Sequence, residues 1–295
     1  MIHVPSLSDY ADVVERWHLR RPTLRIGRPS AEPLVTIITV TRNAVTTLPA
    51  CLASVASQSW PWVEHLVIDG GSSDGTVEFL RNQREFPVGW ISEPDHGISD
   101  AFNKGIALAR GSVIGLLNAD DLYLPHAISS SVMALAKDAQ ASFAHGGCDY
   151  SLDGEVVLRQ AGDPRYAASI SRRLSVSHPT MFVRASAYAR HGLYRTDLQL
   201  AMDHDFLLRL HHAGDYGTVI NHPISCMALG GVSGRRMWAA QWESTQVTIE
   251  HGEPAVRARA RFALTMAIPT LRMLSACLGL RHVRRWLRKR QRPKH

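Results

Sequence analysis

The sequence contains few cysteines and no long uninterrupted hydrophobic run. Its four cysteines are scattered and form no CxxC pair, so we expect neither a disulfide framework nor a zinc site, and a reducing cytoplasm suits the chain. Residues 1–33 lack the apolar segment of a signal peptide. The apolar run of residues 262–280 is interrupted by Pro269 and Arg272, which disfavours a transmembrane helix.

Two common nucleotide-binding motifs are also missing. The segment DGGSSDGT (residues 69–76) lacks the Lys and the following Ser or Thr of a P-loop, and it does not fit the GxGxxG pattern of dinucleotide-binding folds. Its glycines and serines still allow the backbone to approach a ligand closely. The segment therefore predicts a ligand-binding loop, but neither of those two folds.

Acidic residues are absent from residues 254–295, which hold 12 of the 33 Lys and Arg residues. Residues 1–253 hold the other 21 against 26 Asp and Glu, so a mildly acidic body precedes a strongly basic tail. We expect the tail to contact an anionic membrane surface, and helices packed on the rest of the chain are the alternative. Nucleic acid is not expected as a partner, because no aromatic platform or known nucleic-acid-binding fold accompanies the charge.

The first 140 residues alternate between predicted strands and helices. The composition, 45% hydrophobic and 20% charged, is that of an ordinary globular protein. Apolar and β-branched runs predict strands at residues 34–41, 65–68, 88–91 and 112–117, and each is followed by a helical pattern. This alternation predicts an α/β fold, with a mostly parallel sheet and helices on both faces.

From about residue 141 the pattern becomes mixed α+β. We expect a hairpin of residues 142–148 and 155–160, turned at Asp153 and Gly154. Further strands are expected at residues 174–183 and 222–229, and a helix at residues 200–211. Residues 1–33 are predicted to form an extension over the first domain, with a short helix over residues 9–18.

Residues 112–125 (SVIGLLNADDLYLP) contain the strongest candidate site. A buried strand is predicted to end at Asn118, directly before Asp120 and Asp121, and ligands of α/β sheets bind beyond the carboxyl ends of the strands. One interpretation is a solvated turn before a helix, because Asp and Asn favour turns and N-caps. The other is a Mg²⁺ or Mn²⁺ site, since these ions bind through one or two carboxylates and the phosphates of a substrate.

Several other side chains also have a structural and a functional interpretation. Asp203 and Asp205 stand near the start of the predicted helix 200–211, where the helix dipole alone favours carboxylates. Lys104, four residues after an aspartate, either forms a surface salt bridge or meets phosphate oxygens in the crevice. His178, beside a proline, is most simply a structural hydrogen-bond partner. Residues 230–236, GGVSGRR, are predicted to form a basic loop that folds over an anionic ligand.

An ordered set of motifs resembles the family 2 glycosyltransferases, which have a GT-A fold. The motifs are VTIITVTRNAVTTLPACLASVASQ (35–58), VIDGGSSDGT (67–76), SEPDHGISDAFNKGIALARG (92–111), NADD (118–121), HPTMFV (178–183) and AMDHDFLLRL (201–210). The resemblance extends over about residues 34–250, and the order of the motifs is far more specific than any one of them. It favours the functional interpretation of the two adjacent aspartates.

The resemblance implies a role for each matching residue. Thr41, Arg42, Asn43 and Asp69 would line the nucleotide pocket, Asp120 would contact the ribose, Asp121 would ligate a divalent metal on the donor diphosphate, Asp203 would be the general base, and His178 would lie near the acceptor. The sequence departs from the family in two places. NADD is one residue off a literal DxD, and the Glu that usually precedes the base is Met202 here. The choice between Asp203 and Asp205 therefore stays open, with Asp203 favoured by motif register.

The chemistry of sugar transfer requires the same parts. Displacing a nucleoside diphosphate builds negative charge on the leaving phosphate, which a metal on Asp121, together with Lys104 or the loop 231–236, would offset. A single carboxylate that takes a proton from the acceptor hydroxyl gives inversion. We expect a metal-dependent inverting hexosyltransferase that uses Mn²⁺ or Mg²⁺ and moves a sugar from a nucleotide-sugar donor to a glycan or lipid-linked acceptor, in the synthesis of a cell-surface polysaccharide or glycolipid.

The expected organisation is an N-terminal extension (1–33), a GT-A domain (34–250) and a basic amphipathic tail (251–295). The domain comprises a nucleotide-sugar-binding half (34–140) and an acceptor-side half (141–250), and residues 257–295 would hold the protein at the inner face of the cytoplasmic membrane. A catalytically silent nucleotide-sugar-binding protein is one alternative. A sugar nucleotidyltransferase is another, although the sequence after the first strand, TRNAV, lacks the glycine-rich loop that binds a triphosphate.

Overall fold

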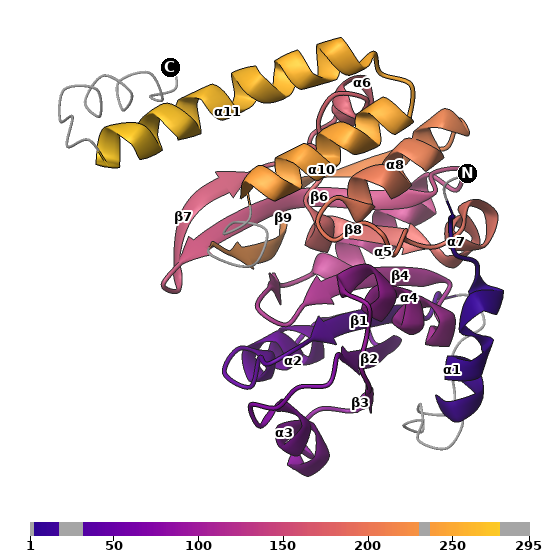
Figure 1. The fold of residues 1–295 in the computed structure, drawn as a ribbon. Helices are drawn as coiled ribbons and strands as arrows, with labels where there is room; N and C mark the ends of the chain where they lie inside the picture. The colour runs from indigo at the N-terminus through magenta and orange to yellow at the C-terminus, as the bar shows by residue number, and fades with distance from the viewer. Residues whose placement is uncertain (1–2, 18–31, 230–236, 278–295) are drawn as a thin grey trace.

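The computed structural model describes residues 3–17, 32–229 and 237–277, and Figure 1 shows their arrangement. The strands are β1 (Val35–Thr41), β2 (Val63–Asp69), β3 (Val88–Ser92), β4 (Val113–Asn118), β5 (Leu122–Tyr123), β6 (Phe143–Leu152), β7 (Glu155–Gln160), β8 (Met181–Arg184) and β9 (Gly217–Ala228). The helices are η1 (Leu7–Tyr10), α1 (Ala11–Trp17), α2 (Leu48–Ala56), α3 (Thr76–Asn82), α4 (Ile98–Leu108), α5 (Ala127–Lys137), α6 (Tyr166–Ser169), η2 (His178–Thr180), α7 (Ala185–His191), α8 (Met202–His212), α10 (Met237–Glu250) and α11 (Ala255–Cys277).

The first half of the chain forms the parallel part of a single mixed sheet. The strands of this sheet lie in the order β3-β2-β1-β4-β8-β6-β9-β5, with β7 paired to β6. The pairs β3/β2, β2/β1 and β1/β4 are parallel, as the alternation of strands and helices predicts. Every residue of β1 is buried, because helices cover both faces of this part of the sheet. The predicted α/β architecture is confirmed.

Helix α4 packs against the strand β1 at a position without a side chain. A Cβ atom at Gly105 would lie 2.3 Å from Cγ2 of Ile38, so only glycine allows this approach. The N-terminal helix α1 packs on α4 in turn, and the buried Tyr10 hydroxyl donates a hydrogen bond of 2.8 Å to Asp100 Oδ1. The helix expected over residues 9–18 is thus present through Trp17, and residue 18 lies outside the described residues.

The second half of the sheet is mixed, as expected for the acceptor-side region. The β6–β7 hairpin is confirmed, and its turn places Asp153 and Gly154 at positive φ angles of 51° and 86°. β8 pairs antiparallel with both β4 and β6 and so joins this region to the parallel half. The parallel pair β6/β9 then extends the sheet to the short β5, which was not predicted.

The strand predicted at residues 174–183 is wrong over most of its length. Only Met181–Arg184 form a strand, and the preceding residues 178–180 form a 3-10 turn in which the N–H of Thr180 donates to the carbonyl of Ser177 at 2.9 Å. Pro179 explains the difference, because proline has no N–H for a strand partner and its fixed φ suits a turn. The last strand also begins earlier than expected, at Gly217 instead of His222.

Two long helices, α10 and α11, follow the sheet and pack on each other. They lie above the mixed half of the sheet, and α10 also contacts α8 (Figure 1). No described helix has the length and hydropathy needed to cross a bilayer. The predicted basic loop 231–236 and the residues of the basic tail beyond 277 lie outside the described residues.

Candidate active site

The strands β1, β2 and β4, which lead into the predicted nucleotide site, have their carboxyl ends at the same edge of the parallel sheet. Thr41, the last residue of β1, pairs with Asp69 of β2, and Val40 pairs with Asn118 of β4. Neighbouring strands lie about 4.8 Å apart, so the three strand ends form one short row. Among the described residues, the buried Thr41 Oγ1 and Asn118 Oδ1 have no hydrogen-bond partner. The sheet therefore presents unpaired polar atoms at the place where α/β folds bind ligands.

Asp69 organises the loop that follows β2. Its fully buried carboxylate accepts hydrogen bonds from the N–H groups of Gly71 (3.1 Å) and Ser72 (3.0 Å), from the Ser92 hydroxyl (2.6 Å) and from the Ser72 hydroxyl. These partners hold the loop 70–76 in place beside Thr41. Asp69 thus shapes the predicted nucleotide pocket mainly through its loop.

The turn after β1 is tied to this loop. Asn43 has a positive φ of 53°, its N–H donates to Ser72 Oγ (2.7 Å), and its Oδ1 accepts from the N–H of Ser73 (2.8 Å). Asparagine tolerates this left-handed conformation better than most residues. Arg42, beside it, is exposed. The structure therefore brings Thr41, Arg42, Asn43 and Asp69 together, as the sequence predicted.

The two adjacent aspartates after β4 have different environments. Asp120 is exposed, whereas Asp121 is only 2% exposed and accepts a hydrogen bond of 3.0 Å from Asn118 Nδ2. Burial raises the pKa of Asp121 to about 7, and the charge of the neighbouring Asp120 makes a smaller contribution in the same direction. None of the groups that shift this pKa is a cation. A buried carboxylate that lacks a cationic partner fits a hard divalent ion, although no cluster of three or more ligand side chains occurs within the described ranges.

A cavity of about 310 Å³ lies next to these strand ends. Asn118 and Asp203 both line it, together with Ile98, Tyr150, Gln160, Leu174, Ser175, Val176, Ser177, His178, Gln199, Leu200, Met202 and Met227. Asp121 is linked to the cavity wall by its hydrogen bond from Asn118, which lines the cavity. The cavity therefore joins the NADD segment to the first turn of α8.

Asp203 is a buried carboxylate at the cavity wall. It lies in the first turn of α8, and the N–H of His204 donates to its Oδ1 at 2.8 Å. Burial raises its pKa to about 7, and the charge of Glu243 adds to the shift. A carboxylate with a pKa near neutrality can both accept and release a proton under physiological conditions.

Glu243 anchors the start of α8 and was not identified from the sequence. Its carboxylate accepts hydrogen bonds from the N–H groups of Gln199 (2.9 Å), Leu200 (2.5 Å) and Ala201 (2.6 Å). These N–H groups precede the helix, so a carboxylate from α10 holds the backbone that leads into Asp203. No local pattern reveals this role, because Glu243 is distant from α8 in sequence.

His178 lines the cavity with both ring nitrogens unpartnered among the described residues. Its ring lies 4.9 Å from the ring of Phe102, and burial lowers its pKa to about 4, so the imidazole is neutral at pH 7. The described residues provide no partner for the structural hydrogen bond that the sequence suggested. A neutral imidazole offers one donor and one acceptor to a ligand in the cavity.

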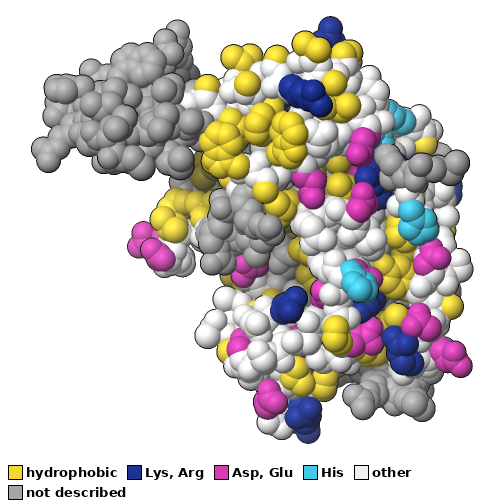
Figure 2. Space-filling model, viewed as in Figure 1, with side chains coloured by type: hydrophobic (Ala, Val, Ile, Leu, Met, Phe, Trp, Pro, Cys, Tyr) yellow, Lys and Arg dark blue, Asp and Glu magenta, His cyan; other side chains and the backbone are white. Residues whose placement is uncertain are grey.

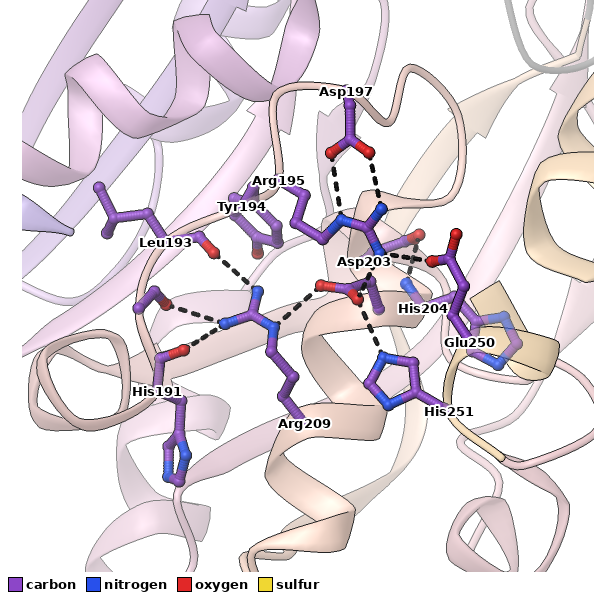
Figure 3. Close-up of polar contacts among 12 residues, drawn as sticks. His191, Leu193, Tyr194, Arg195, Asp197, Asp203, His204, Arg209, Glu250 and His251 are labelled. Atoms are coloured by element: carbon purple, nitrogen blue, oxygen red, sulfur yellow. Dashed lines mark hydrogen bonds and ion pairs between the residues drawn. The ribbon is translucent and has the colours of Figure 1, made fainter. Parts of the chain in front are cut away.

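Asp205 belongs to an ion-pair network with Arg195, Arg209 and His251, and these three partners are labelled in Figure 3. It accepts from Arg209 Nε (2.9 Å), Arg195 Nη1 (3.4 Å) and His251 Nε2 (2.9 Å), and it is 1% exposed. Burial alone would raise its pKa, but His251 and the two guanidinium groups together lower it. Asp205 therefore crosslinks helices and does not line the cavity with Asp203.

Lys104 is also held by other residues. Its ammonium contacts Glu93 Oε1 (2.9 Å), Asp100 Oδ2 (3.6 Å) and the carbonyl oxygen of Pro94 (2.9 Å). The side chain is 8% exposed, so the predicted salt bridge to Asp100 exists but is buried. Glu93 and Pro94 lie at hydrogen-bond distance from the ammonium, and Asp100 adds a longer ion pair.

A second, larger hollow of about 410 Å³ lies at the other end of α8, lined by Leu208 and His212 among others. None of the residues predicted to bind the donor, the metal or the acceptor lines it. We therefore place the candidate site in the smaller cavity, where the unpartnered polar groups and the perturbed carboxylate lie together.

Comparisons with known proteins agree with this fold. The family model "Glycosyl transferase family 2" matches residues 36–193. An uncharacterized glycosyltransferase of Mycobacterium tuberculosis is 32% identical over 185 residues, which cover 61% of this chain and 70% of the relative. A PGL/p-HBAD biosynthesis glycosyltransferase of the same species is 29% identical over 188 residues, with the same coverage.

Two solved structures share the fold. The mannosyltransferase PcManGT from Pyrobaculum calidifontis, in complex with GDP-Man and Mn²⁺, has a TM-score of 0.56 and 19% identity, covering 95% of this chain and 90% of its own. TarS 1-349 of S. aureus, in complex with UDP-GlcNAc, has a TM-score of 0.55 and 15% identity, covering 78% and 70%. The matched family model extends over more than half of the sequence, and the chain belongs to glycosyl transferase family 2.

Proposed function

We propose that this glycosyltransferase is an inverting, metal-dependent hexosyltransferase whose donor and acceptor sites meet in the cavity between β4 and α8. The observation that carries the proposal is that Asn118, which holds Asp121, lines the same cavity as Asp203. A parallel-sheet edge with unpaired polar atoms thus lies beside a buried carboxylate whose pKa is near neutrality.

In this proposal the donor lies along the strand ends. Thr41, Arg42, Asn43 and Asp69 form the nucleotide pocket with the loop 70–76, and Asp120 contacts the ribose. Asp121 would hold a divalent ion, Mn²⁺ or Mg²⁺, and such an ion would supply positive charge against the departing diphosphate. Residues 34–140 would then be the nucleotide-sugar half of the domain, and residues 141–250 the acceptor half.

Asp203 acts as the general base. It takes a proton from the acceptor hydroxyl, whose oxygen bonds to the anomeric carbon while the bond from that carbon to the diphosphate oxygen breaks. A single displacement inverts the configuration at this carbon. His178, neutral and unpartnered, hydrogen-bonds an acceptor hydroxyl. Lys104 and Asp205 have no part in this scheme, because their charged groups are already paired.

The acceptor is a glycan or a lipid-linked sugar, and the basic tail keeps the enzyme at the inner face of the cytoplasmic membrane. The names of relatives support this assignment. One is an O-antigen biosynthesis protein of Myxococcus xanthus, 29% identical over 225 residues, which cover 71% of this chain and 17% of the relative. The M. tuberculosis relative in PGL/p-HBAD biosynthesis also points to surface glycolipids.

A thermal-shift screen of nucleoside diphosphates with and without Mn²⁺ tests the metal and donor sites. Ligands that bind only the folded chain stabilise it, by about 2.7 kcal/mol at a hundredfold excess over Kd. We expect one diphosphate to stabilise the protein only with the metal, and Asp121→Asn to abolish the shift. The control is Asp153→Asn in the exposed hairpin turn. Equal shifts with and without metal would contradict the role of Asp121.

A turnover assay with the nucleotide sugar of the diphosphate found in the screen then distinguishes an enzyme from a silent binding protein. It measures transfer of the sugar to water or to an acceptor. Nucleoside diphosphate should be released from the matching nucleotide sugar by the wild type. Binding without any release would favour the silent binding protein instead.

A further inference from the structure

An exposed aromatic cluster lies on the two helices that follow the sheet. Trp238 and Trp242 of α10 are 41% and 43% exposed, and their rings lie 6.3 Å and 5.2 Å from the ring of Phe262 on α11. We call these three residues the aromatic face. Figure 2 shows hydrophobic side chains gathered over this part of the molecule. Large exposed aromatic groups of this kind mark an interaction surface.

The helices around the aromatic face expose no unpaired carboxylate. Glu243 binds the N–H groups that precede α8, Glu250 pairs with Arg195 (2.6 Å), and Glu253 pairs with Arg261 (2.6 Å). These are the only acids between residues 237 and 295. Each of them is therefore held by a partner within the protein.

Exposed basic side chains also lie on α11, the helix that carries Phe262. Arg257 and Arg259 of α11 are exposed, and the sequence continues into the basic residues 281–295. The partner of this surface must therefore tolerate aromatic side chains and carry negative charge. A second copy of the chain would bring a like-charged surface and be repelled.

We infer that the aromatic face docks on an anionic phospholipid bilayer. Tryptophan is enriched at membrane interfaces, where its ring lies among the headgroups and its N–H remains hydrated. Basic residues near the surface add electrostatic attraction to anionic lipid, which falls off within a Debye length. The described helices need not span the bilayer, because such a face binds in the plane of the interface.

Docking through this face fixes the orientation of the catalytic cavity. Trp242 is exposed, while its neighbour Glu243 holds the backbone that leads into Asp203. One helix therefore connects the membrane contact to the proposed base. Such an orientation would suit an acceptor carried on lipid. That interpretation rests on the proposed function, whereas the inferred binding to lipid is independent of it.

Flotation of the full-length protein with phosphatidylglycerol vesicles and with phosphatidylcholine vesicles tests the inference. The wild type should float with phosphatidylglycerol and not with phosphatidylcholine. The double variant Trp238→Ser/Trp242→Ser should need about tenfold more lipid for half-maximal flotation, because it loses two interfacial anchors. The control Met133→Ser removes an even more exposed apolar side chain from α5, and this variant should bind like the wild type.

Three outcomes would overturn the inference. The first is that the wild type fails to float with phosphatidylglycerol vesicles, and the second is that the double variant floats as well as the wild type. The third is that the double substitution converts a dimer to a monomer in sedimentation velocity. The last outcome would assign the face to a second copy. Release of nucleoside diphosphate without vesicles should be the same in the wild type and the double variant. Vesicle binding by a protein that releases none would disprove the proposed function and leave the docking face intact.

Discussion

Asn118 and Asp203 line one cavity, although they come from the end of β4 and the first turn of α8. Asn118 donates a hydrogen bond to Asp121, and Asp203 is a buried carboxylate whose pKa is raised to about 7. The hydrogen-bond donor to the proposed metal ligand and the proposed base thus line the same hollow.

Asp203→Asn should remove most of the transfer activity without unfolding the protein. Asn keeps the size of Asp203 but cannot take a proton, and losing a general base typically costs about 10²–10⁴ in rate. Because burial penalises the charged carboxylate, the neutral amide should leave the thermal midpoint unchanged or raise it. Turnover and thermal unfolding measure the two effects. Wild-type turnover in this variant would show that another group is the base.

The pH dependence of kcat/KM should show the titration of Asp203. The base must be unprotonated, so activity should rise with pH and reach half its maximum near pH 7. At saturating divalent metal, which would keep Asp121 ionised, Asp203→Asn should lack this rise in its residual activity. The stability effect has the opposite sign. The pKa is raised from 3.8, so the contribution of Asp203 to folding is fully present below pH 3.8 and is lost as pH rises through about 7.

Asp205→Ala should destabilise the protein far more than it affects the chemistry. Arg195 and Arg209 would lose a shared carboxylate, and breaking a buried ion pair costs about 3–5 kcal/mol in the free energy of unfolding. Urea denaturation measures the loss. Asp12→Ala, which breaks the exposed Arg16 pair, is the control and should leave the urea midpoint nearly unchanged. The pKa of Asp205 is lowered, so its contribution should disappear as the pH falls below 3.8.

His178→Phe should weaken binding of the acceptor and leave binding of the donor unchanged. The ring of Phe fills the same space against Phe102 but cannot hydrogen-bond. One neutral hydrogen bond is worth about 0.5–1.5 kcal/mol, so the acceptor KM should rise up to about tenfold. The thermal shift produced by nucleoside diphosphate and metal serves as the internal control and should not change. If the thermal shift produced by nucleoside diphosphate and metal became smaller while the acceptor KM stayed the same, His178 would belong to the donor site.

The parallel half of the fold could be predicted from the sequence because its signals are local. Buried parallel strands are continuous apolar runs, and the helices between them show helical spacing. The residues at the strand ends, Thr41, Asp69 and Asn118, then share one edge for a geometric reason, since parallel strands end on the same side. The 3-10 turn at residues 178–180 was missed because β-branched and apolar residues around Pro179 also suit a strand.

The sequence by itself determined the family, the α/β class and the aspartates of residues 118–121, because contiguous motifs carry them. The tertiary structure alone decided that Asp203 and not Asp205 lines the cavity, since the two differ only in which helix face they occupy. It also revealed Glu243 at the start of α8 and the exposed Trp238 and Trp242, because burial and long-range pairing depend on how distant segments pack.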